Sequence, residues 1–315
     1  MPEIERIVFM GTPEFAVASL RAIVEAGYNV VGVITAPDKP AGRGRKLKES
    51  DVKVYAKSQN LQILQPTNLK NEDFLEKLRA LRADLQVIVA FRMLPVVVWN
   101  MPPLGSINVH GSLLPNYRGA APIHWAVING EKETGVSTFF LKQEIDTGNI
   151  IGQAKTDIEP DNTTGEIYYK LMHLGAKLLL ETLENIKKED YKEIPQDLSL
   201  TAQHAPKIFK KHCLIDWSRQ AKDIHNLIRG LNPFPTAFTA LHGKVIKIHT
   251  SKLIDSEQTL KPGEISIANK QLLVGTGSQP IQLIGLQMEG KKRSSANDFI
   301  NAYLQEEGSY NFTNQ

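Results

Sequence analysis

The first 34 residues contain a strand–helix–strand pattern, which restricts the possible folds more than any other feature of the chain. Residues 4–10 (IERIVFM) form an apolar, β-branched run that stops at Gly11-Thr12-Pro13. Residues 15–25 carry apolar side chains at helical spacing, and a second β-branched run follows at residues 30–34. Two strands joined through one helix by brief connections are expected to be parallel members of one sheet, linked by a right-handed crossover.

The same alternation of strands and helices continues to residue 187. We expect helices near residues 51–59, 71–81 and 164–187, and strands at 85–90, 106–110 and 135–141. Residues 1–187 therefore predict a doubly wound, Rossmann-like α/β domain. The turn after the first strand has one glycine followed by Thr-Pro instead of G-x-G-x-x-G, and this disfavours an NAD(P) oxidoreductase.

The remaining residues differ in character from the first part. Residues 188–208 are polar, contain Pro195 and Pro206, and are interpreted as a linker. Residues 209–315 contain a helical pattern at 217–229, followed by short apolar runs separated by Gly, Pro and Asn. These runs predict a small β-barrel domain. This part holds thirteen Lys and Arg against nine Asp and Glu, which suits nucleic-acid binding, although a purely structural role is the alternative.

Composition restricts the class of protein. The single cysteine, Cys213, excludes an intramolecular disulfide and any zinc site built from several cysteines. No apolar stretch reaches the roughly 18–20 residues needed to span a bilayer, and the N-terminus lacks the basic start of a signal peptide. We expect a cytoplasmic protein that does not bind a membrane.

The net charge is only +3, but residues 39–48 hold five basic residues and no acid, and residues 291–293 are Lys-Lys-Arg. Such runs are often simply solvated surface.

The densest group of chemically useful residues lies in and just after the expected strand 106–110. Asn108 and His110 are two residues apart, so their side chains share one face of that strand, at the edge where open α/β sheets bind ligands. Asp146 follows the strand expected at 135–141, in a Gly-closed loop (Asp-Thr-Gly). A structural histidine, an asparagine cap and an ordinary tight turn are the non-catalytic interpretations of the three residues.

An Asn, a His and an Asp together suit acyl transfer to an amine. The Asn amide can donate a hydrogen bond to the oxygen that becomes negative as the carbonyl carbon becomes tetrahedral. The His can take a proton from the attacking ammonium or stabilise the same oxygen. The Asp can orient the His and tune its charge. The attacking amine is itself the nucleophile, so no covalent intermediate on the protein is required.

Long segments of the chain resemble the folate-dependent formyltransferases, and among these the methionyl-tRNA formyltransferases are the most similar. The segments are INVHGSLLPNYRGAAPIHWAV at residues 107–127, EIDTGNII at 144–151, RIVFMGTPEFAVASL at 6–20, VITAPDKPAGRGRKL at 33–47, IRGLNPFPTAF at 228–238 and LQMEGKKRSSANDFI at 286–300, with the shorter ILQP, APKI and IDWS. The resemblance therefore extends over nearly the whole chain.

The resemblance implies roles for particular residues. It makes Asn108, His110 and Asp146 the catalytic trio, and it assigns the stretch Ser112, Leu113, Leu114 and Pro115 to the folate site. The loop AFRMLP would contribute Phe91, Met93 and Leu94 to the pterin pocket, although it is one residue shorter than the usual form in the family and carries Arg92. The formyl donor would be 10-formyltetrahydrofolate, with no metal required.

The resemblance also implies a partner, methionyl-initiator tRNA. The loop at residues 37–48 would probe the acceptor end of the tRNA through Arg43, Arg45 and Lys46. The C-terminal domain, 209–315, would be an OB-like barrel that holds the tRNA by charge, with Lys291, Lys292 and Arg293 as phosphate contacts. We expect the protein to act as a monomer.

Three other functions compete with this interpretation. One is a formyltransferase that acts on a purine precursor or a nucleotide-linked amino sugar, and another is a hydrolase that releases formate to water. The third is an RNA-binding protein that keeps the fold without the catalysis. The basic loop and the appended basic barrel argue against the first two, because small acceptors do not need them. The presence of Asn108, His110 and Asp146 together argues against the third.

Overall fold

The computed structural model describes residues 4–41, 46–197, 199, 202–304 and 308–313. Contacts divide the chain into two compact units. The first unit comprises residues 1–119, 135–156 and 168–204, and the second comprises 120–134, 157–167 and 205–315. By contacts, two segments that precede the linker thus belong with the C-terminal part of the chain.

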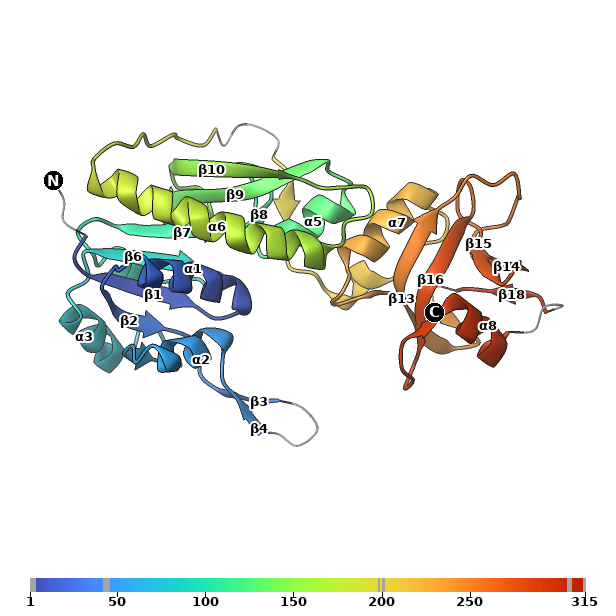
Figure 1. Cartoon of the computed structure of the whole chain (residues 1–315), viewed down its shortest axis with the longest axis horizontal. Coiled ribbons are helices and arrows are strands. Elements are labelled where there is room, and N and C mark those ends of the chain that lie inside the picture. Colours follow the sequence, from blue (N-terminus) through green and yellow to red (C-terminus); the bar gives the residue numbers. More distant parts are fainter. Residues whose placement is uncertain (1–3, 42–45, 198, 200–201, 305–307, 314–315) are drawn as a thin grey trace. The chain divides into compact units, whose positions relative to one another are not determined.

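A seven-stranded sheet is the centre of the first unit (Figure 1). Its strands, in spatial order, are β10 (Ile150–Asp157), β9 (Glu133–Phe140), β7 (Ser106–His110), β6 (Leu85–Val89), β1 (Ile7–Gly11), β2 (Val30–Ile34) and β5 (Ile63–Leu64). The strands from β7 to β5 are parallel, and β9 pairs with β7 in the antiparallel sense. The predicted Rossmann-like α/β class is therefore confirmed.

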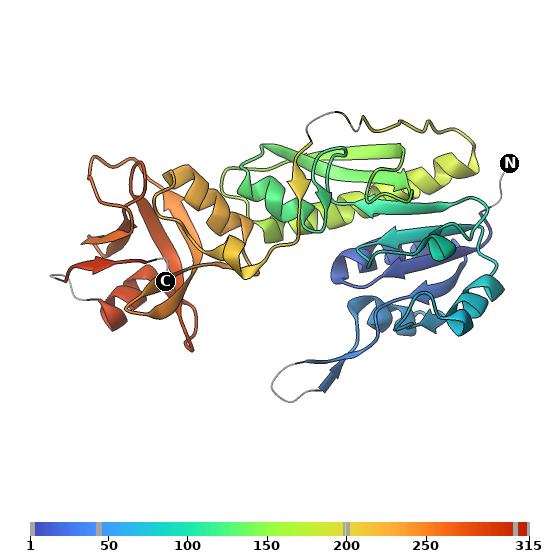
Figure 2. The ribbon, with the colours of Figure 1, turned by 180° about the vertical axis from the view of Figure 1, so that it is seen from behind.

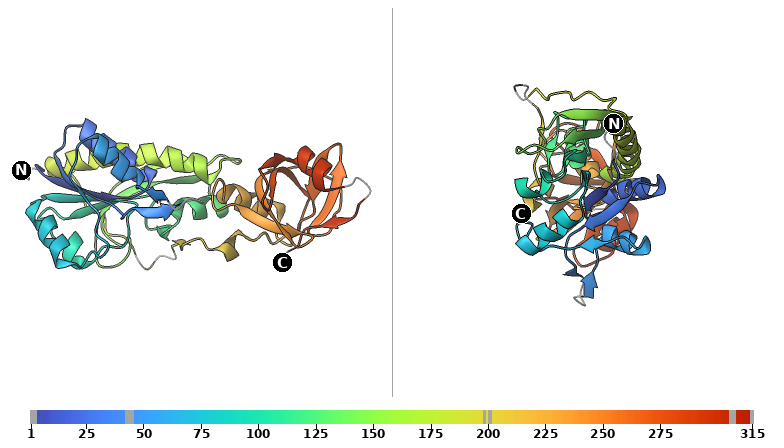
Figure 3. Two further views of the ribbon diagram at one scale, coloured as in Figure 1. Left: turned by 90° about the horizontal axis from the view of Figure 1, so that it is seen from below. Right: turned by 90° about the vertical axis from the view of Figure 1, so that its left-hand side faces the viewer.

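Helices cover both faces of this sheet. They are α1 (Glu14–Glu25), α2 (Asp51–Ser58), α3 (Glu72–Ala80), the short α4 (Val96–Trp99) and α6 (Thr164–Lys187). Phe74 and Leu78 of α3 pack against Val8 and Met10 of β1, whereas Figure 3 shows α1 and α6 on the opposite face. Helix α3 begins where it was expected to begin, because the side chain of Asn71 accepts a hydrogen bond from a backbone N–H of its first turn.

The remaining elements of the first unit are short. Strands β3 (Lys39–Ala41) and β4 (Lys46–Lys48) form a separate antiparallel pair, and β8 (Arg118–Gly119) lies in the turn region after β7. The first strand begins at Ile7 and not at residue 4, because the backbone N–H groups of Glu5 and Arg6 donate to the carboxylate of Asp84 instead of a neighbouring strand. Seen from behind in Figure 2, the chain after α6 returns in an extended conformation along the outer strand of the sheet.

The second unit is built around a closed antiparallel barrel. Its strands, in spatial order, are β12 (Ala237–Leu241), β13 (Lys244–Leu253), β16 (Ile281–Met288), β15 (Gln271–Val274), β14 (Glu264–Ala268) and β18 (Tyr310–Asn311). Thr313, just after β18, exchanges two backbone hydrogen bonds with Ala240 of β12, so the two edges of the sheet meet. The predicted small, OB-like barrel is therefore confirmed.

Helices α5 (Pro122–Ile128), α7 (Ala221–Gly230) and α8 (Ala296–Tyr303) also belong to this unit, with η1 (Lys210–Cys213) and β17 (Ser294–Ser295). Strand β11 (His204–Ala205) lies at the boundary between the two units. The helix predicted at residues 217–229 begins only at Ala221. Asp216 accepts hydrogen bonds from the backbone N–H and the hydroxyl of Ser218, and this turn replaces the first helical turn. In the described part of the chain, no helix combines the length and the apolar character that a membrane span requires.

Candidate active site

Strand β7 places two of the predicted catalytic residues on one face of the sheet. Val109 points toward α6, because a Cβ atom built on Gly175 of that helix would lie 3.1 Å from Val109 Cγ1. Side chains alternate along a strand, so Asn108 and His110 point to the opposite face. That face also carries Ile88, the neighbour of Asn108 on β6, which packs in the core below α3. The predicted common orientation of Asn108 and His110 is present.

His110 is almost completely buried, with 8% of its surface exposed. Its Nε2 atom lies 2.9 Å from the backbone oxygen of Tyr117. A carbonyl oxygen can only accept a hydrogen bond, so Nε2 carries a proton and the ring is held in one orientation. The other ring nitrogen, Nδ1, faces Asp146 Oδ2 at 3.9 Å. Nδ1 is therefore the nitrogen that can exchange a proton.

Asp146 reaches this position through a loop that folds back over the sheet. Because β9 is antiparallel to β7, the loop at residues 141–149 starts beside Ser106, whose oxygen accepts from the N–H of Leu141 at 2.8 Å. It must return about 13 Å, four residues of strand, to reach His110. Asp146 adopts a left-handed backbone (φ +54°), and its Oδ2 accepts from the N–H of Gly119 at 3.0 Å.

Asn108 completes the group. Its side chain is half-buried, and its amide makes no hydrogen bond to any of the residues that the structure describes. A polar amide beside a buried His–Asp pair, at the carboxyl edge of the parallel strands, is suited to donate to a bound ligand. The three residues that the sequence singled out are thus brought together at the end of β7.

The loop at residues 112–115 is held mainly by bonds inside the protein. The Ser112 hydroxyl is fully buried and donates to the backbone oxygen of Asn116 at 2.7 Å. Leu114 is buried against Phe139 and Ile150, and its N–H donates to Ser137 Oγ at 3.1 Å. Half-buried Leu113 and Pro115 are the members of this stretch with side-chain surface toward solvent.

The second predicted folate loop follows β6. Phe91 and Leu94 are half-buried against the core below α3, whereas 73% of the Met93 side chain is exposed. The Arg92 guanidinium donates to the backbone oxygens of Pro66 and Thr67 and lies 5.7 Å from the centre of the Phe91 ring. Arg92 therefore anchors this loop to a neighbouring turn, and Met93 is its exposed apolar side chain.

Several groups that organise the site were not found from the sequence. The Tyr117 carbonyl and the Gly119 N–H are backbone groups, and no side-chain pattern reveals them. Gln196 lies in the region interpreted as a linker, yet its side-chain nitrogen donates to the backbone oxygens of Asp146 and Gly148 at 2.9 and 2.8 Å. An isolated glutamine in a polar stretch gives no signal of such a role.

The basic residues predicted to bind tRNA lie in two places. Arg43 and Arg45 fall outside the described residues, and Lys46 opens β4 of the two-stranded β3–β4 pair. Lys291, Lys292 and Arg293 are exposed in the turn between β16 and β17 of the second unit. The two acids that flank the β3–β4 pair, Asp38 and Glu49, are paired with Lys53 and Lys57 of α2.

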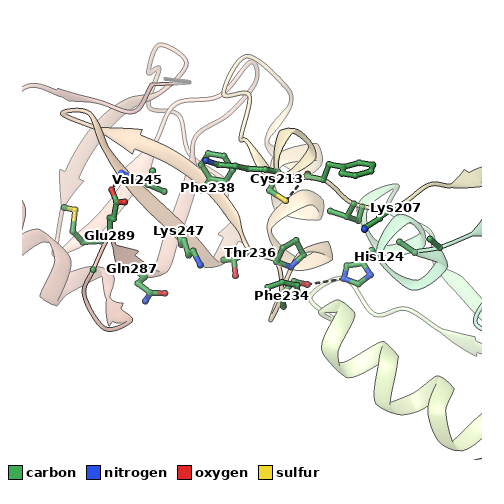
Figure 4. A pocket seen from close by; sticks show the side chains of 18 residues that line it. His124, Lys207, Cys213, Phe234, Thr236, Phe238, Val245, Lys247, Gln287 and Glu289 are labelled. Atoms are coloured by element: carbon green, nitrogen blue, oxygen red, sulfur yellow. Dashed lines mark hydrogen bonds between the residues drawn. The ribbon is translucent and has the colours of Figure 1, made fainter. Parts of the chain in front are cut away.

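A cavity of about 790 Å³ opens on the second unit (Figure 4). Aromatic rings and lysines line it together: Lys207 lies 5.7 Å from the centre of the Phe209 ring, and Lys210 lies 5.7 Å from that of Phe238. His124 Nε2 is 3.1 Å from the backbone oxygen of Phe234 on the cavity wall, and burial lowers the pKa of this histidine. The cavity is thus lined mainly by apolar groups, with Lys207, Lys210, Lys247 and Glu289 among its charged residues.

Two family models together match most of the chain. The family model described as "Formyl transferase" matches residues 5–183, and "Formyl transferase, C-terminal domain" matches 207–304. A methionyl-tRNA formyltransferase of Bacteroides fragilis is 50% identical over 307 residues, 95% of each chain. One from Flavobacterium johnsoniae is 49% identical over 300 residues, 94% of this chain and 95% of its own.

Solved structures show the same fold at low identity. An N-formyltransferase from Helicobacter canadensis, in complex with folinic acid and dTDP-3-aminofucose, has a TM-score of 0.68 at 21% identity, covering 91% of this chain and all of its own. HypX from Aquifex aeolicus, in complex with tetrahydrofolic acid, has a TM-score of 0.65 at 17% identity, covering 98% and 51%. By its sequence, the chain belongs to the formyltransferase family, and within it to the methionyl-tRNA formyltransferases.

Proposed function

We propose that this protein transfers the formyl group of 10-formyltetrahydrofolate to the amino group of methionyl-initiator tRNA, giving N-formylmethionyl-tRNA for translation initiation. The observation that carries the chemistry is the arrangement at the end of β7. His110 presents one fixed nitrogen, Nδ1, to the Asp146 carboxylate, and the Asn108 amide lies two residues away on the same face. The near-full-length similarity to methionyl-tRNA formyltransferases supports the acceptor.

Each catalytic residue has a separate task. Nδ1 of His110 takes the proton that the attacking ammonium must lose, because Nε2 is already bound to Tyr117. The Asp146 carboxylate, 3.9 Å away, stabilises the charged imidazolium that results. The bond between the formyl carbon and the folate nitrogen then breaks, and the imidazolium returns its proton to that nitrogen as tetrahydrofolate leaves. The Asn108 amide donates to the formyl oxygen as it gains negative charge, a contribution worth about 3 kcal/mol in comparable sites. This charge pairing is strengthened because both His110 and Asp146 are largely removed from water.

The formyl donor fits the residues around this group. The donor supplies an activated formyl group, and the Asn108 amide, which has no hydrogen-bond partner among the described residues, is suited to hold its oxygen. Side-chain surface for a flat ring system is offered by Leu113 and Pro115 of one loop and by Met93 of the other. Phe91 and Leu94 of the second loop are half-buried. Ser112 and Leu114 shape that surface by holding the loop.

The tRNA would be bound by positive charge from both units. The β3–β4 pair, with Arg43, Arg45 and Lys46, is assigned to the acceptor end, and Lys291, Lys292 and Arg293 to the phosphate backbone. Accordingly, residues 1–187 are assigned to catalysis, 188–208 to the connection, and 209–315 to tRNA binding. We further assign the protein to the cytoplasm and propose that it is a monomer. Light scattering of the purified protein, with and without tRNA, tests whether it is a monomer.

One competition experiment tests the acceptor. The protein is incubated with 10-formyltetrahydrofolate and a mixture of methionyl-initiator tRNA, free methionine and dTDP-amino sugar, and the formylated products are separated. We expect the tRNA to receive formyl groups at least about 100-fold faster per mole than either small amine. Preferential formylation of the sugar would support the function named for the Helicobacter canadensis structure. Release of formate without any acceptor would support a hydrolase.

A further inference from the structure

The segment after α6 runs along the loop that carries Asp146. Ile194 exchanges two backbone hydrogen bonds with Ile150, both at 2.8 Å, and Glu193 accepts a hydrogen bond from the side chain of Asn149 at 2.8 Å. The Tyr191 ring lies 6.0 Å from that of Phe140. Residues 191–196 therefore form a strap across both ends of the loop at residues 141–149 (Figure 2).

Gln196 makes four hydrogen bonds from the end of this strap. Its Nε2 donates to the backbone oxygens of Asp146 and Gly148 at 2.9 and 2.8 Å. Its Oε1 accepts from Nε and Nη2 of Arg118 at 3.0 and 2.8 Å. The orientation of the amide is fixed by its partners, because two carbonyl oxygens can only accept and a guanidinium can only donate.

These bonds reach both chain segments that hold the catalytic carboxylate. Asp146 has a left-handed backbone conformation, and the Gln196 amide donates a hydrogen bond to the backbone oxygen of Asp146. Arg118 directly precedes Gly119, whose N–H donates to Asp146 Oδ2. Gln196 thus joins two turns, the one that carries Asp146 and the one at Arg118 and Gly119 that binds the Asp146 carboxylate. Its own hydrogen bonds do not include that carboxylate.

We propose that Gln196 is a positioning residue for formyl transfer, which acts by fixing the Asp146 carboxylate opposite His110 Nδ1. This inference rests on the catalytic roles proposed for His110 and Asp146. Without the Gln196 amide, the turn at residues 146–148 loses two donors, and the carboxylate moves away from the nitrogen that it stabilises. A displacement on the scale of 1 Å is enough to slow an enzyme strongly.

The test is a kinetic comparison of three variants. In Gln196→Ala we expect kcat to fall about tenfold while KM for formyl donor and tRNA changes less than about twofold, because binding surfaces are untouched. Gln196→Glu keeps an acceptor for Arg118 but turns a carboxylate toward two carbonyl oxygens, so it is expected to be no faster than Gln196→Ala. Glu193→Ala, which removes a strap–loop bond away from Asp146, is the matched control and is expected to keep wild-type kcat.

A double-variant comparison separates positioning from general weakening of the fold. In an Asp146→Ala background, Gln196→Ala has no carboxylate to position and is expected to lower kcat less than about twofold further. A full tenfold additional loss would overturn the proposal, as would wild-type kcat in Gln196→Ala or in Gln196→Glu. If the wild-type protein formylates no tRNA, the proposed function fails and not the role of Gln196.

Discussion

At the scale of single residues, buried hydrogen bonds fix the His110 ring so that its Nδ1 atom faces Asp146. His110 uses Nε2 for the Tyr117 carbonyl, so only Nδ1 remains for chemistry. The Tyr117 carbonyl itself belongs to a turn whose previous residue, Asn116, accepts from the buried hydroxyl of Ser112. The orientation of the His110 ring therefore depends on a serine that has no exposed surface with which to contact a ligand.

Substitution of Ser112 tests this structural role. Ser112→Ala leaves the Asn116 carbonyl without its buried donor, so we expect a loss of about 1–3 kcal/mol of unfolding free energy, measured by urea titration. Ser58→Ala removes a similar bond, to the Tyr55 carbonyl at 2.7 Å, from an exposed site and should cost less than about 0.5 kcal/mol. Unchanged stability with a raised KM for the formyl donor would instead show that Ser112 contacts folate directly.

At the scale of elements, the strands at the centre of the sheet were predictable and the loops around the site were not. Strand β7 matches its predicted range of residues 106–110, because Ile107 and Val109 alternate with polar residues between two glycines, a pattern typical of a strand. The strand before Asp146 was also predicted, at 135–141, but its antiparallel direction was not. Consequently the sequence could place Asp146 in a loop, but not show that this loop folds back over the sheet.

The return of this loop requires a glycine at position 148. A Cβ atom there would lie only 1.6 Å from the backbone oxygen of Phe140, so the loop must shift in Gly148→Ala. We expect kcat to fall at least about tenfold, because the carboxylate of Asp146 moves with the loop. Gln143→Ala places an alanine at an exposed position of the same loop and is expected to keep wild-type kcat. Equal activity of both variants would contradict this account of the loop.

The β3–β4 pair carries the prediction for tRNA recognition. Replacing Arg43 and Arg45 by Ala removes two cations, so the slope of log affinity for tRNA against log salt should fall by about 1.5. Discrimination between initiator and elongator tRNA should fall more than binding of the formyl donor. Lys187→Ala/Lys188→Ala removes the same charge from the exposed end of α6 and is the control. If discrimination between initiator and elongator tRNA is unchanged, this discrimination would be assigned to the barrel domain instead.

At the scale of the whole molecule, we expect the two units to differ in their response to acid. The histidines whose pKa is lowered by burial, His124, His225 and His249, all belong to the second unit. For His225 the nearby charge of Arg229 adds to the effect of burial, and Asp161 partly opposes it. A buried neutral histidine gains its proton on unfolding, so the unfolded state binds more protons than the folded state.

Stability of the second unit should therefore fall as pH decreases below about 6.5, the pKa of an unfolded histidine, and be fully restored above it. We expect amide hydrogen exchange between pH 7.5 and 5.5 to show weaker protection in the barrel and α7, once corrected for intrinsic exchange rates. His225→Gln should reduce this loss, and His173→Gln, at an exposed position of α6, should not. Equal loss of protection in both units would contradict the prediction.

The central claim is that His110, Asn108 and Asp146 carry out formyl transfer, and single-turnover kinetics on methionyl-initiator tRNA test it most directly. With saturating formyl donor, we expect His110→Ala to slow the transfer step about 100-fold or more, and Asn108→Ala and Asp146→Asn to slow it at least about tenfold. Affinity for tRNA should stay within about twofold of wild type, as it should in the control His173→Ala. Transfer by His110→Ala at the wild-type rate, or a slower rate explained by weaker tRNA binding alone, would contradict the claim.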